Sequence, residues 1–455
     1  MTIRFARRVL LAAAALLLAG CASSPAGDTH PPIVFVHGNG DSAALWHSTV
    51  WRFESNGWPR ERLHAIDLPY PLARDADDKP QEGRTSSAEH MQFLSAEVDR
   101  VLRRTGQTRV VLMGNSRGGY AIRNYIANGG GAAKVSHAIL GGVPNHGVWA
   151  STTFRPNSEF NGTGPFLSAL NSLPGEITAG VKWLTVRSDS NDKFAQPDGV
   201  WIGAKGTPTH VGFDGPELKG AQNLVIAGID HRETSFSPKA FAAAYSFITG
   251  REPATLAVSA ESQVTLSGKV SGMGLANRAG TGNFANNLAL AGTEVEVYAV
   301  DPESGERLGT ALTRQKVGAD GLWGPLTTTP KTALEFQVSA ADFATTHIYR
   351  SAFARSSNLV HLRAERISQA DRDAAALVTL TRPRGYFGVP RDRISLDAKR
   401  PPEGIPTGVA GVSVARARLP DATPRAVRAE FNGERIVGRT WPVSGNHVVL
   451  LELHD

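Results

Sequence analysis

The sequence contains a single cysteine, Cys21, among 455 residues. One thiol cannot close an intramolecular disulfide, so a fold held together by disulfides is excluded. Charged residues make up only 20% of the chain against 41% hydrophobic residues, which excludes wholesale disorder. Gly and Pro are abundant, at 47 and 27 residues, and they favour many turns over long uninterrupted helices.

Positive charge is in slight excess, and it is scattered along the chain. The formal net charge is +6, and three of these charges belong to Arg4, Arg7 and Arg8, in a segment that we expect to be removed. The remaining Arg and Lys do not gather on one stripe. We therefore expect no nucleic-acid partner.

The first 21 residues have the organisation of an export signal. The same three arginines form a basic region, and the apolar stretch 9–18 that follows is too short to span a bilayer permanently. The segment closes with Leu18-Ala19-Gly20-Cys21, which resembles a bacterial lipobox, where the cysteine becomes the lipidated first residue of the mature protein. The alternative is an ordinary cleaved signal that happens to contain a cysteine.

A lipid anchor at Cys21 explains why an exported chain without disulfides keeps one thiol. We predict a lipoprotein signal peptide over residues 1–21, a small polar tether over 22–30, and membrane attachment through the lipid on Cys21. The protein is then exported and held at the bacterial cell envelope. The outer membrane is favoured because Ala22 is not acidic, and secretion is the alternative.

Residues 31–250 alternate strand-like and helix-like stretches. Apolar runs at Ile33–Val36 and Val110–Met113 indicate buried strands, and apolar positions at helical spacing over Ser86–Arg104 indicate a helix that Gly106 ends. A second helix is predicted over 118–128, and further strands at 62–68, 138–140, 183–186 and 224–227. This alternation predicts an α/β domain, with a mostly parallel sheet covered by helices on both faces.

Residues 253–455 show a different pattern. Polar and apolar residues alternate with period two, as over Thr293–Val300, and turn sequences separate these stretches. Helical spacing is scarce apart from about Ser368 to Ala376. We predict an all-β C-terminal region of one or two sandwich-like modules, with the division near residue 400 if there are two.

The segment Gly114-Asn115-Ser116-Arg117-Gly118 matches the pattern G-x-S-x-G. Alone the pattern is weak, but here it directly follows a predicted strand and directly opens a predicted helix, as a nucleophile elbow requires. The glycines allow a tight turn that exposes the serine hydroxyl. We predict that Ser116 is a catalytic nucleophile. The alternative is a glycine-rich loop with an incidental serine.

A serine hydroxyl needs a general base that is itself oriented by an acid. His231 follows the predicted strand 224–227, and Asp192 lies in the loop after the strand 183–186. This gives the chain order Ser, Asp, His of an α/β-hydrolase triad. Asp189 and Asp198 are alternative acids, and we expect the aspartates that are not used to be turn residues or helix N-caps.

Acyl transfer also needs hydrogen-bond donors for the oxyanion of the tetrahedral intermediate. Arg117 follows the nucleophile directly, and His37-Gly38-Asn39-Gly40 follows the first buried strand. We predict that the backbone N–H groups of Asn39 and Arg117 form the oxyanion hole.

These motifs together resemble lipases and esterases of the α/β-hydrolase superfamily, in particular bacterial and archaeal lipases with an extra C-terminal β domain. The likeness covers residues 31–250 by motif and the C-terminal region only by architecture. It implies hydrolysis of carboxylic esters or lipids, from esters with short acyl chains to triacylglycerols. It also implies that the enzyme needs no cofactor. We expect no metal site, because His347 and His361 fit no compact ligand spacing.

The elbow departs from the commoner lipase pattern. Asn115 and Arg117 stand where His and Met or Leu often stand. An arginine beside the nucleophile argues against a purely apolar substrate.

Residues 145–180 form a long connection rich in Gly, Pro and Phe. A long irregular connection in a compact domain is usually functional, and its aromatic residues predict a lid over an acyl pocket. The alternative is a fixed cap that packs on the sheet. His146 is interpreted either as a substrate contact or as a solvated loop residue.

Three functions follow from these observations. The leading hypothesis is a lipase or carboxylesterase that works through an acyl-enzyme. The first alternative is an extracellular depolymerase of polyesters such as polyhydroxyalkanoates, and the second is a non-catalytic surface binding lipoprotein, which the complete Ser–Asp–His set disfavours. The C-terminal region could contact acyl chains, bind a polymer or carbohydrate, or only stabilise the protein.

Overall fold

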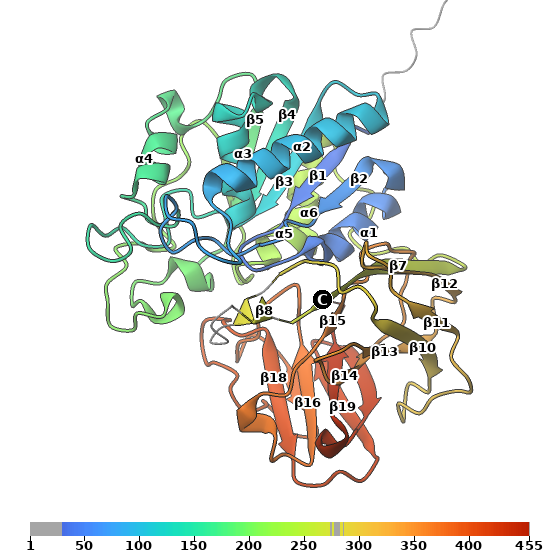
Figure 1. The fold of residues 1–455 in the computed structure, drawn as a ribbon. Helices are drawn as coiled ribbons and strands as arrows, with labels where there is room; N and C mark the ends of the chain where they lie inside the picture. Colours follow the sequence, from blue (N-terminus) through green and yellow to red (C-terminus); the bar gives the residue numbers. More distant parts are fainter. Residues whose placement is uncertain (1–29, 274, 277–282, 285, 455) are drawn as a thin grey trace, which may run out of the picture.

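The computed structural model describes residues 30–454 except 274, 277–282 and 285. Cys21, the predicted signal peptide and almost all of the tether therefore lie outside the described residues. An α/β domain, coloured blue to green, packs against a β-rich region, coloured yellow to red (Figure 1). Among the helices of the described part, none is long and apolar enough to cross a membrane.

The α/β domain is built on a parallel sheet of six strands in the order β2-β1-β3-β4-β5-β6. Its strands are β1 (Ile33–Val36), β2 (Leu63–Ile66), β3 (Val110–Asn115), β4 (Val135–Gly141), β5 (Lys182–Arg187) and β6 (Gln222–Val225). The strand order reverses between β1 and β3, which are hydrogen-bonded neighbours. In open α/β sheets, ligands bind where the loops after two such strands diverge.

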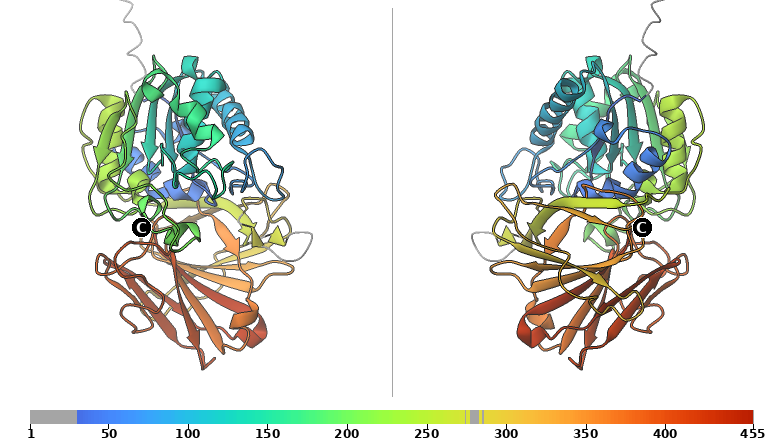
Figure 2. Two further views of the ribbon diagram at one scale, coloured as in Figure 1. Left: turned by 90° about the vertical axis from the view of Figure 1, so that its left-hand side faces the viewer. Right: turned by 90° about the vertical axis from the view of Figure 1, so that its right-hand side faces the viewer.

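Helices cover both faces of this sheet, as Figure 2 shows from two sides. They are α1 (His47–Ser55), α2 (Ser87–Thr105), α3 (Arg117–Asn128), α4 (Pro165–Asn171), α5 (Glu233–Phe236) and α6 (Pro238–Thr249). The predicted α/β class with helices on both faces is confirmed.

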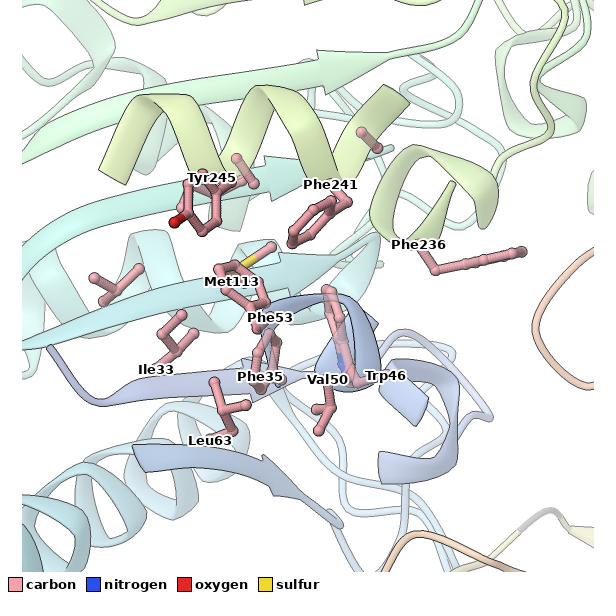
Figure 3. Close-up of a cluster of buried hydrophobic side chains, with 14 of the residues drawn as sticks. Ile33, Phe35, Trp46, Val50, Phe53, Leu63, Met113, Phe236, Phe241 and Tyr245 are labelled. Carbon is pink, nitrogen blue, oxygen red and sulfur yellow. The ribbon is translucent and has the colours of Figure 1, made fainter. Parts of the chain in front are cut away.

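Alternate side chains of each central strand enter opposite cores, because successive residues of a strand point to opposite faces. Ile33 and Phe35 pack with α1 and α6 in one core, and Val34 and Val36 pack with α2 and α3 in the other. Figure 3 shows the first core, where Phe241 of α6 points toward the sheet. Continuous apolar runs in β1 and β3 are explained by this burial on both faces.

Helix α2 begins and ends as its sequence predicts. Ser86 accepts a hydrogen bond from the N–H of Glu89, and the Glu89 carboxylate accepts one from the N–H of Ser86, which forms a capping box. Gly106 ends the helix in the left-handed conformation, with φ of 68°.

The C-terminal region is all-β and contains several sheets. Seven strands form the largest sheet, in the order β11-β10-β13-β14-β21-β16-β18. The strands of the region are β7 (Val264–Gly272), β8 (Leu275–Ala276), β9 (Asn283–Phe284), β10 (Glu294–Val300), β11 (Thr313–Lys316), β12 (Leu322–Thr328), β13 (Ala333–Ser339), β14 (Thr345–Arg350), β15 (Leu362–Ala364), β16 (Ala376–Thr381), β17 (Ile394–Leu396), β18 (Val414–Leu419), β19 (Ala426–Phe431), β20 (Glu434–Arg439) and β21 (His447–Glu452).

The large sheet crosses residue 400 without a break, because β16 pairs with β18 on one side and with β21 on the other. The sheet therefore gives no sign of a division near that residue. The helical spacing noted over Ser368 to Ala376 corresponds only to a 3-10 turn at Gln369–Asp371, and β16 begins at Ala376.

The two parts share buried residues. Trp51 of α1 belongs to the core of the C-terminal region, and its indole N–H donates to the carbonyl oxygen of Ser356 at 2.9 Å. His454, near the end of the chain, lies 5.8 Å from Trp51 between ring centroids. The C-terminal region is therefore joined to the α/β domain by packing as well as by the chain.

Candidate active site

Ser116 lies on a strained turn between β3 and α3. Its φ of 49° is unusual for a residue with a side chain. A Cβ atom on Gly118 would lie 2.4 Å from the carbonyl oxygen of Val36, and one on Gly114 would lie 2.6 Å from Cδ1 of Ile122. Both glycines of the motif are thus required by close packing, and the elbow geometry that they permit is present.

His231 and Asp192 are brought together by the loops after β5 and β6. The Nδ1 atom of His231 lies 2.9 Å from each carboxylate oxygen of Asp192. Both residues are buried, with 2% and 8% of their surface exposed. Nε2 of His231 is buried and has no hydrogen-bond partner in the described part of the chain. Ser116 and His231 line the same cavity, although no hydrogen bond joins them.

The two alternative acids have other partners. Asp189 accepts hydrogen bonds from the N–H groups of Gly228 at 3.0 Å and Asn191 at 3.1 Å, so it ties the two loops together. Asp198 accepts from the N–H of Val200 within its own turn. Of the three aspartates considered, Asp192 is the one that contacts His231.

Further side chains fix the loop that carries His231. Asn115 of the elbow donates to the hydroxyl of Ser235 at 2.9 Å, and the hydroxyl of Thr234 donates to the carbonyl oxygen of His231 at 2.6 Å. Asn115, which departs from the commoner lipase pattern, therefore links the elbow to the start of α5.

The loop after β1 is held by His37. Nε2 of His37 accepts a hydrogen bond from the N–H of Leu68 at 3.1 Å, which leaves Nδ1 to donate to the carbonyl oxygen of Gly38 at 2.9 Å. Burial lowers the pKa of His37, which agrees with this neutral form. The side-chain oxygen of Asn39 accepts from the N–H of Ala73 at 2.8 Å. Gly38 and Asn39 line the cavity beside Ser116.

The side chain of Arg117 does not line this cavity. It is fully buried, and its guanidinium forms a bidentate ion pair with Glu159, with Nη2 at 3.0 Å from Oε2 and Nε at 2.5 Å from Oε1. It also donates to the carbonyl oxygen of Pro71 at 3.1 Å. The expectation that this arginine influences the substrate is wrong, and the residue instead anchors the segment 145–180.

The cavity in front of Ser116 has a volume of about 240 Å³. Its polar floor contains Gly38, Asn39, Ser116 and His231, and its walls are largely aromatic. The aromatic residues come from three parts of the chain and are Trp149, Phe160, Phe194, Trp201 and Tyr386. Phe194 lies edge-on against His231, with ring centroids 4.6 Å apart.

Two arginines also line the cavity. Arg155 lies near Asp75, with 3.7 Å between Nη1 and Oδ1, and Arg232 lies 3.1 Å from Asp41 between Nε and Oδ2. Sequence reasoning missed Phe194, Trp201, Arg155, Arg232 and Tyr386 as cavity residues. Arg232 directly follows His231, and Phe194 lies shortly after Asp192. This closeness to predicted triad members could have indicated both as cavity residues.

The segment 145–180 divides into a cavity wall and a packed part. Trp149 and Phe160 line the cavity, and Phe160 also packs on Tyr120 of α3 together with Phe166 and Leu167. Nε2 of His146 lies 3.2 Å from Oε2 of Glu176, away from the cavity lining. Together with the buried ion pair of Arg117 and Glu159, these contacts indicate that the segment 145–180 is a cap packed on the domain. A moving lid stays a prediction.

Within the described residues, no group of three or more His, Cys, Asp or Glu side chains is arranged to hold an ion.

Comparison with known families agrees with this architecture. Residues 31–155 match the family model for the alpha/beta hydrolase fold, and residues 262–367 match the model for the lipase C-terminal domain. The first range contains the loop after β1, the elbow and part of the cap, and the second covers the first half of the β-rich region.

Several solved structures are similar to this chain at low identity. Bacillus licheniformis lipase BlEst2 in its propeptide form is 15% identical, with 91% of this chain and 93% of that chain covered and a TM-score of 0.36. Aspergillus fumigatus lipase B is 14% identical, with 50% and 55% covered and a TM-score of 0.35. The carboxylesterase CesB of Bacillus subtilis is 13% identical, with 49% and 85% covered and a TM-score of 0.27.

These scores are too low to carry an argument. The sheet topology, the elbow and the family model over residues 31–155 identify an α/β-hydrolase fold in the first part of the chain, and residues 262–367 match the model for the lipase C-terminal domain.

Proposed function

We propose that this protein hydrolyses carboxylic esters through an acyl-enzyme on Ser116. Asp192 orients His231, and His231 acts as general base and then as general acid. The observation that carries this proposal is the contact of 2.9 Å between Nδ1 of His231 and the Asp192 carboxylate, with Nε2 left without a partner beside the cavity of Ser116.

The proposed reaction has two stages, acylation of Ser116 and hydrolysis of the acyl-enzyme. Oγ of Ser116 attacks the ester carbonyl carbon while its proton passes to Nε2 of His231. The backbone N–H groups of Asn39 and Arg117 donate to the resulting oxyanion. Collapse of the tetrahedral intermediate breaks the bond to the alcohol, which leaves with the proton from Nε2. Water then attacks the acyl-enzyme by the same route and releases the acid.

The cavity also bears on the size of the substrate. Pockets for drug-sized ligands hold roughly 300–1,000 Å³, and the cavity here is smaller, at about 240 Å³. Its aromatic walls favour an apolar acyl or alcohol group of modest size. We therefore propose esters of short or medium acyl chains as substrates, rather than long-chain triacylglycerols.

Hydrolysis of p-nitrophenyl esters from acetyl to palmitoyl tests this function. The chain from residue 22 onward is assayed beside its Ser116→Ala variant. We expect turnover that is greatest at or below the octanoyl ester and that is absent from the variant. The absence of turnover on every ester would contradict the proposal.

We further propose that Cys21 carries a lipid that anchors the exported protein to the cell envelope. Support comes from the sequence around Cys21 alone. Mass spectrometry of the protein expressed with its leader in a bacterial host tests it: a diacylated N-terminal cysteine is expected, and a Cys21→Ser variant should stay unmodified.

A further inference from the structure

A loop of the C-terminal region reaches the loop that carries His231. Arg382, just after β16, is buried, and its Nη1 lies 2.7 Å from Oδ2 of Asp230, the residue that precedes His231. Its Nη2 lies 2.6 Å from Oε1 of Glu233, at the start of α5. The guanidinium of Arg382 also lies over the ring of Phe431, 4.6 Å from its centroid.

Both carboxylate oxygens of Asp230 accept hydrogen bonds, Oδ1 from its own loop and Oδ2 from the C-terminal region. Oδ1 accepts from the N–H groups of Arg232 at 2.8 Å and Glu233 at 3.0 Å. Oδ2 accepts from Arg382 and from the N–H of Tyr386 at 2.8 Å. Burial alone would raise the pKa of Asp230, but the neighbouring guanidinium groups hold it below its ordinary value. Asp230 is therefore a charged and fully bonded link between the two parts of the protein.

The same cluster fixes Tyr386 in the wall of the cavity. The carbonyl oxygen of Tyr386 accepts hydrogen bonds from Nη1 of Arg382 at 2.8 Å and Nη2 of Arg391 at 2.7 Å. The ring of Tyr386 lines the cavity, with Nζ of Lys193 3.9 Å and Cζ of Arg232 4.8 Å from its centroid. One set of contacts thus sets the position of both the His231 loop and a cavity wall.

The loop of Asp192 is tied to the C-terminal region as well. The N–H of Ala410 donates to the side-chain oxygen of Asn191 at 3.0 Å, and Nζ of Lys193 donates to the carbonyl oxygen of Gly411 at 2.8 Å. Both residues that flank Asp192 therefore contact the connection before β18. This connection and the Arg382 loop lie outside both family-model matches.

We propose that the loop 382–391 and the connection at 410–411 complete the active site, an inference that rests on the proposed function. Arg382 is a positioning residue that acts on His231 through Asp230. Tyr386 is a specificity-determining residue that limits the size of the bound ester. This gives the C-terminal region a part in the reaction, in place of a passive or separate polymer-binding role.

Steady-state kinetics of Arg382→Gln test the positioning role. We expect kcat to fall at least tenfold and KM to change less than threefold, measured well below the melting temperature of the variant. Arg382→Lys keeps one charged donor for Asp230 and should recover part of the lost kcat. The matched control is Arg400→Gln, because the Arg400 pair with Glu430 is mostly exposed, at 68% and 50% of the two side chains.

A purely structural Arg382 would give a different result. The melting temperature of the Arg382→Gln or Arg382→Lys protein would fall, but its kcat in the folded state would stay within twofold of the kcat of the protein without the substitution. This result would overturn the positioning role. The lysine variant retains the charge in the cluster and so keeps the test open if the glutamine variant does not fold.

Tyr386→Ala tests the specificity role on the same set of p-nitrophenyl esters. Removal of the ring enlarges the cavity, so we expect the ratio of kcat/KM for the decanoyl ester to that for the butyryl ester to rise at least fivefold. Arg400→Gln should leave the ratio unchanged. If the Tyr386→Ala protein is active but its ratio is unchanged, the specificity role of Tyr386 is overturned while the proposed function stands. If the protein without any substitution hydrolyses none of the esters, the proposed function itself is overturned.

Discussion

Asp230 and His231 are neighbours in the chain, yet each is bonded to a different part of the protein. His231 contacts Asp192 within the α/β domain at 2.9 Å, and Asp230 receives the guanidinium of Arg382 from the C-terminal region at 2.7 Å. A single peptide bond therefore joins the candidate general base to the contact between the two parts. Reorientation of one part against the other would move the imidazole relative to Ser116.

The identity of the acid gives the first prediction. Asp192→Asn should lower kcat by about 10⁴-fold, because an amide no longer favours the tautomer of His231 that accepts the serine proton. Asp189→Asn should lower kcat less than tenfold, since Asp189 bonds to backbone N–H groups of the two loops. Steady-state kinetics of both variants check this, and a larger loss for the Asp189 variant would refute the assignment of Asp192.

The buried pair of Arg117 and Glu159 gives a prediction about stability. Glu159→Gln leaves the Arg117 guanidinium buried without its counter-charge, so the free energy of unfolding should fall by about 3–5 kcal/mol. Urea denaturation measures this change. The control is Glu97→Gln, which breaks the exposed pair with Arg100 and should cost less than about 1 kcal/mol. Equal losses for the two variants would show that Glu159 is not an anchor of the cap.

Histidines at the contact between the two parts give a prediction about pH. Burial, with Arg384 nearby, lowers the pKa of His454 to about 3 and holds that of His47 well below its ordinary value. The unfolded chain protonates each near pH 6.5, so below that pH it binds more protons than the folded protein. The free energy of unfolding should therefore fall with decreasing pH toward about 3, by up to about 1.4 kcal/mol per pH unit for each histidine.

Thermal denaturation between pH 7 and pH 4.5 checks this dependence. His454→Gln should reduce the slope of melting temperature against pH, whereas the control His210→Gln, on an exposed loop, should leave it unchanged. Parallel slopes for all three proteins would contradict the role given to His454.

Sequence patterns predicted the strands, helix ends and turns that depend on interactions between residues close together in the chain. Apolar runs identify β1 and β3 because both faces of these strands are buried, and Ser86 and Gly106 mark the ends of α2 by their hydrogen bonding and conformation. The elbow could be predicted because its glycines precede and follow Ser116 at fixed spacing.

The contributions of the C-terminal region could not be predicted in this way. Arg382 and Tyr386 are about 150 residues from Asp230 in sequence, and no periodicity relates positions so distant. The sequence predicted three candidate acids, Asp189, Asp192 and Asp198, and only the fold distinguishes them by their neighbours. The sequence also left open a division near residue 400, because the pairing of β16 with β18 across that residue joins strands that are far apart in the chain.

The reaction of the protein with an active-site phosphonate, followed by peptide mass spectrometry, tests the central claim most directly. Such a reagent phosphonylates an activated serine hydroxyl and requires the base and the oxyanion donors to be in place. The account predicts one modified residue, Ser116, loss of all ester hydrolysis in step with the modification, and no reaction in His231→Ala. Ester hydrolysis that persists in the fully modified protein or in Ser116→Ala would contradict it.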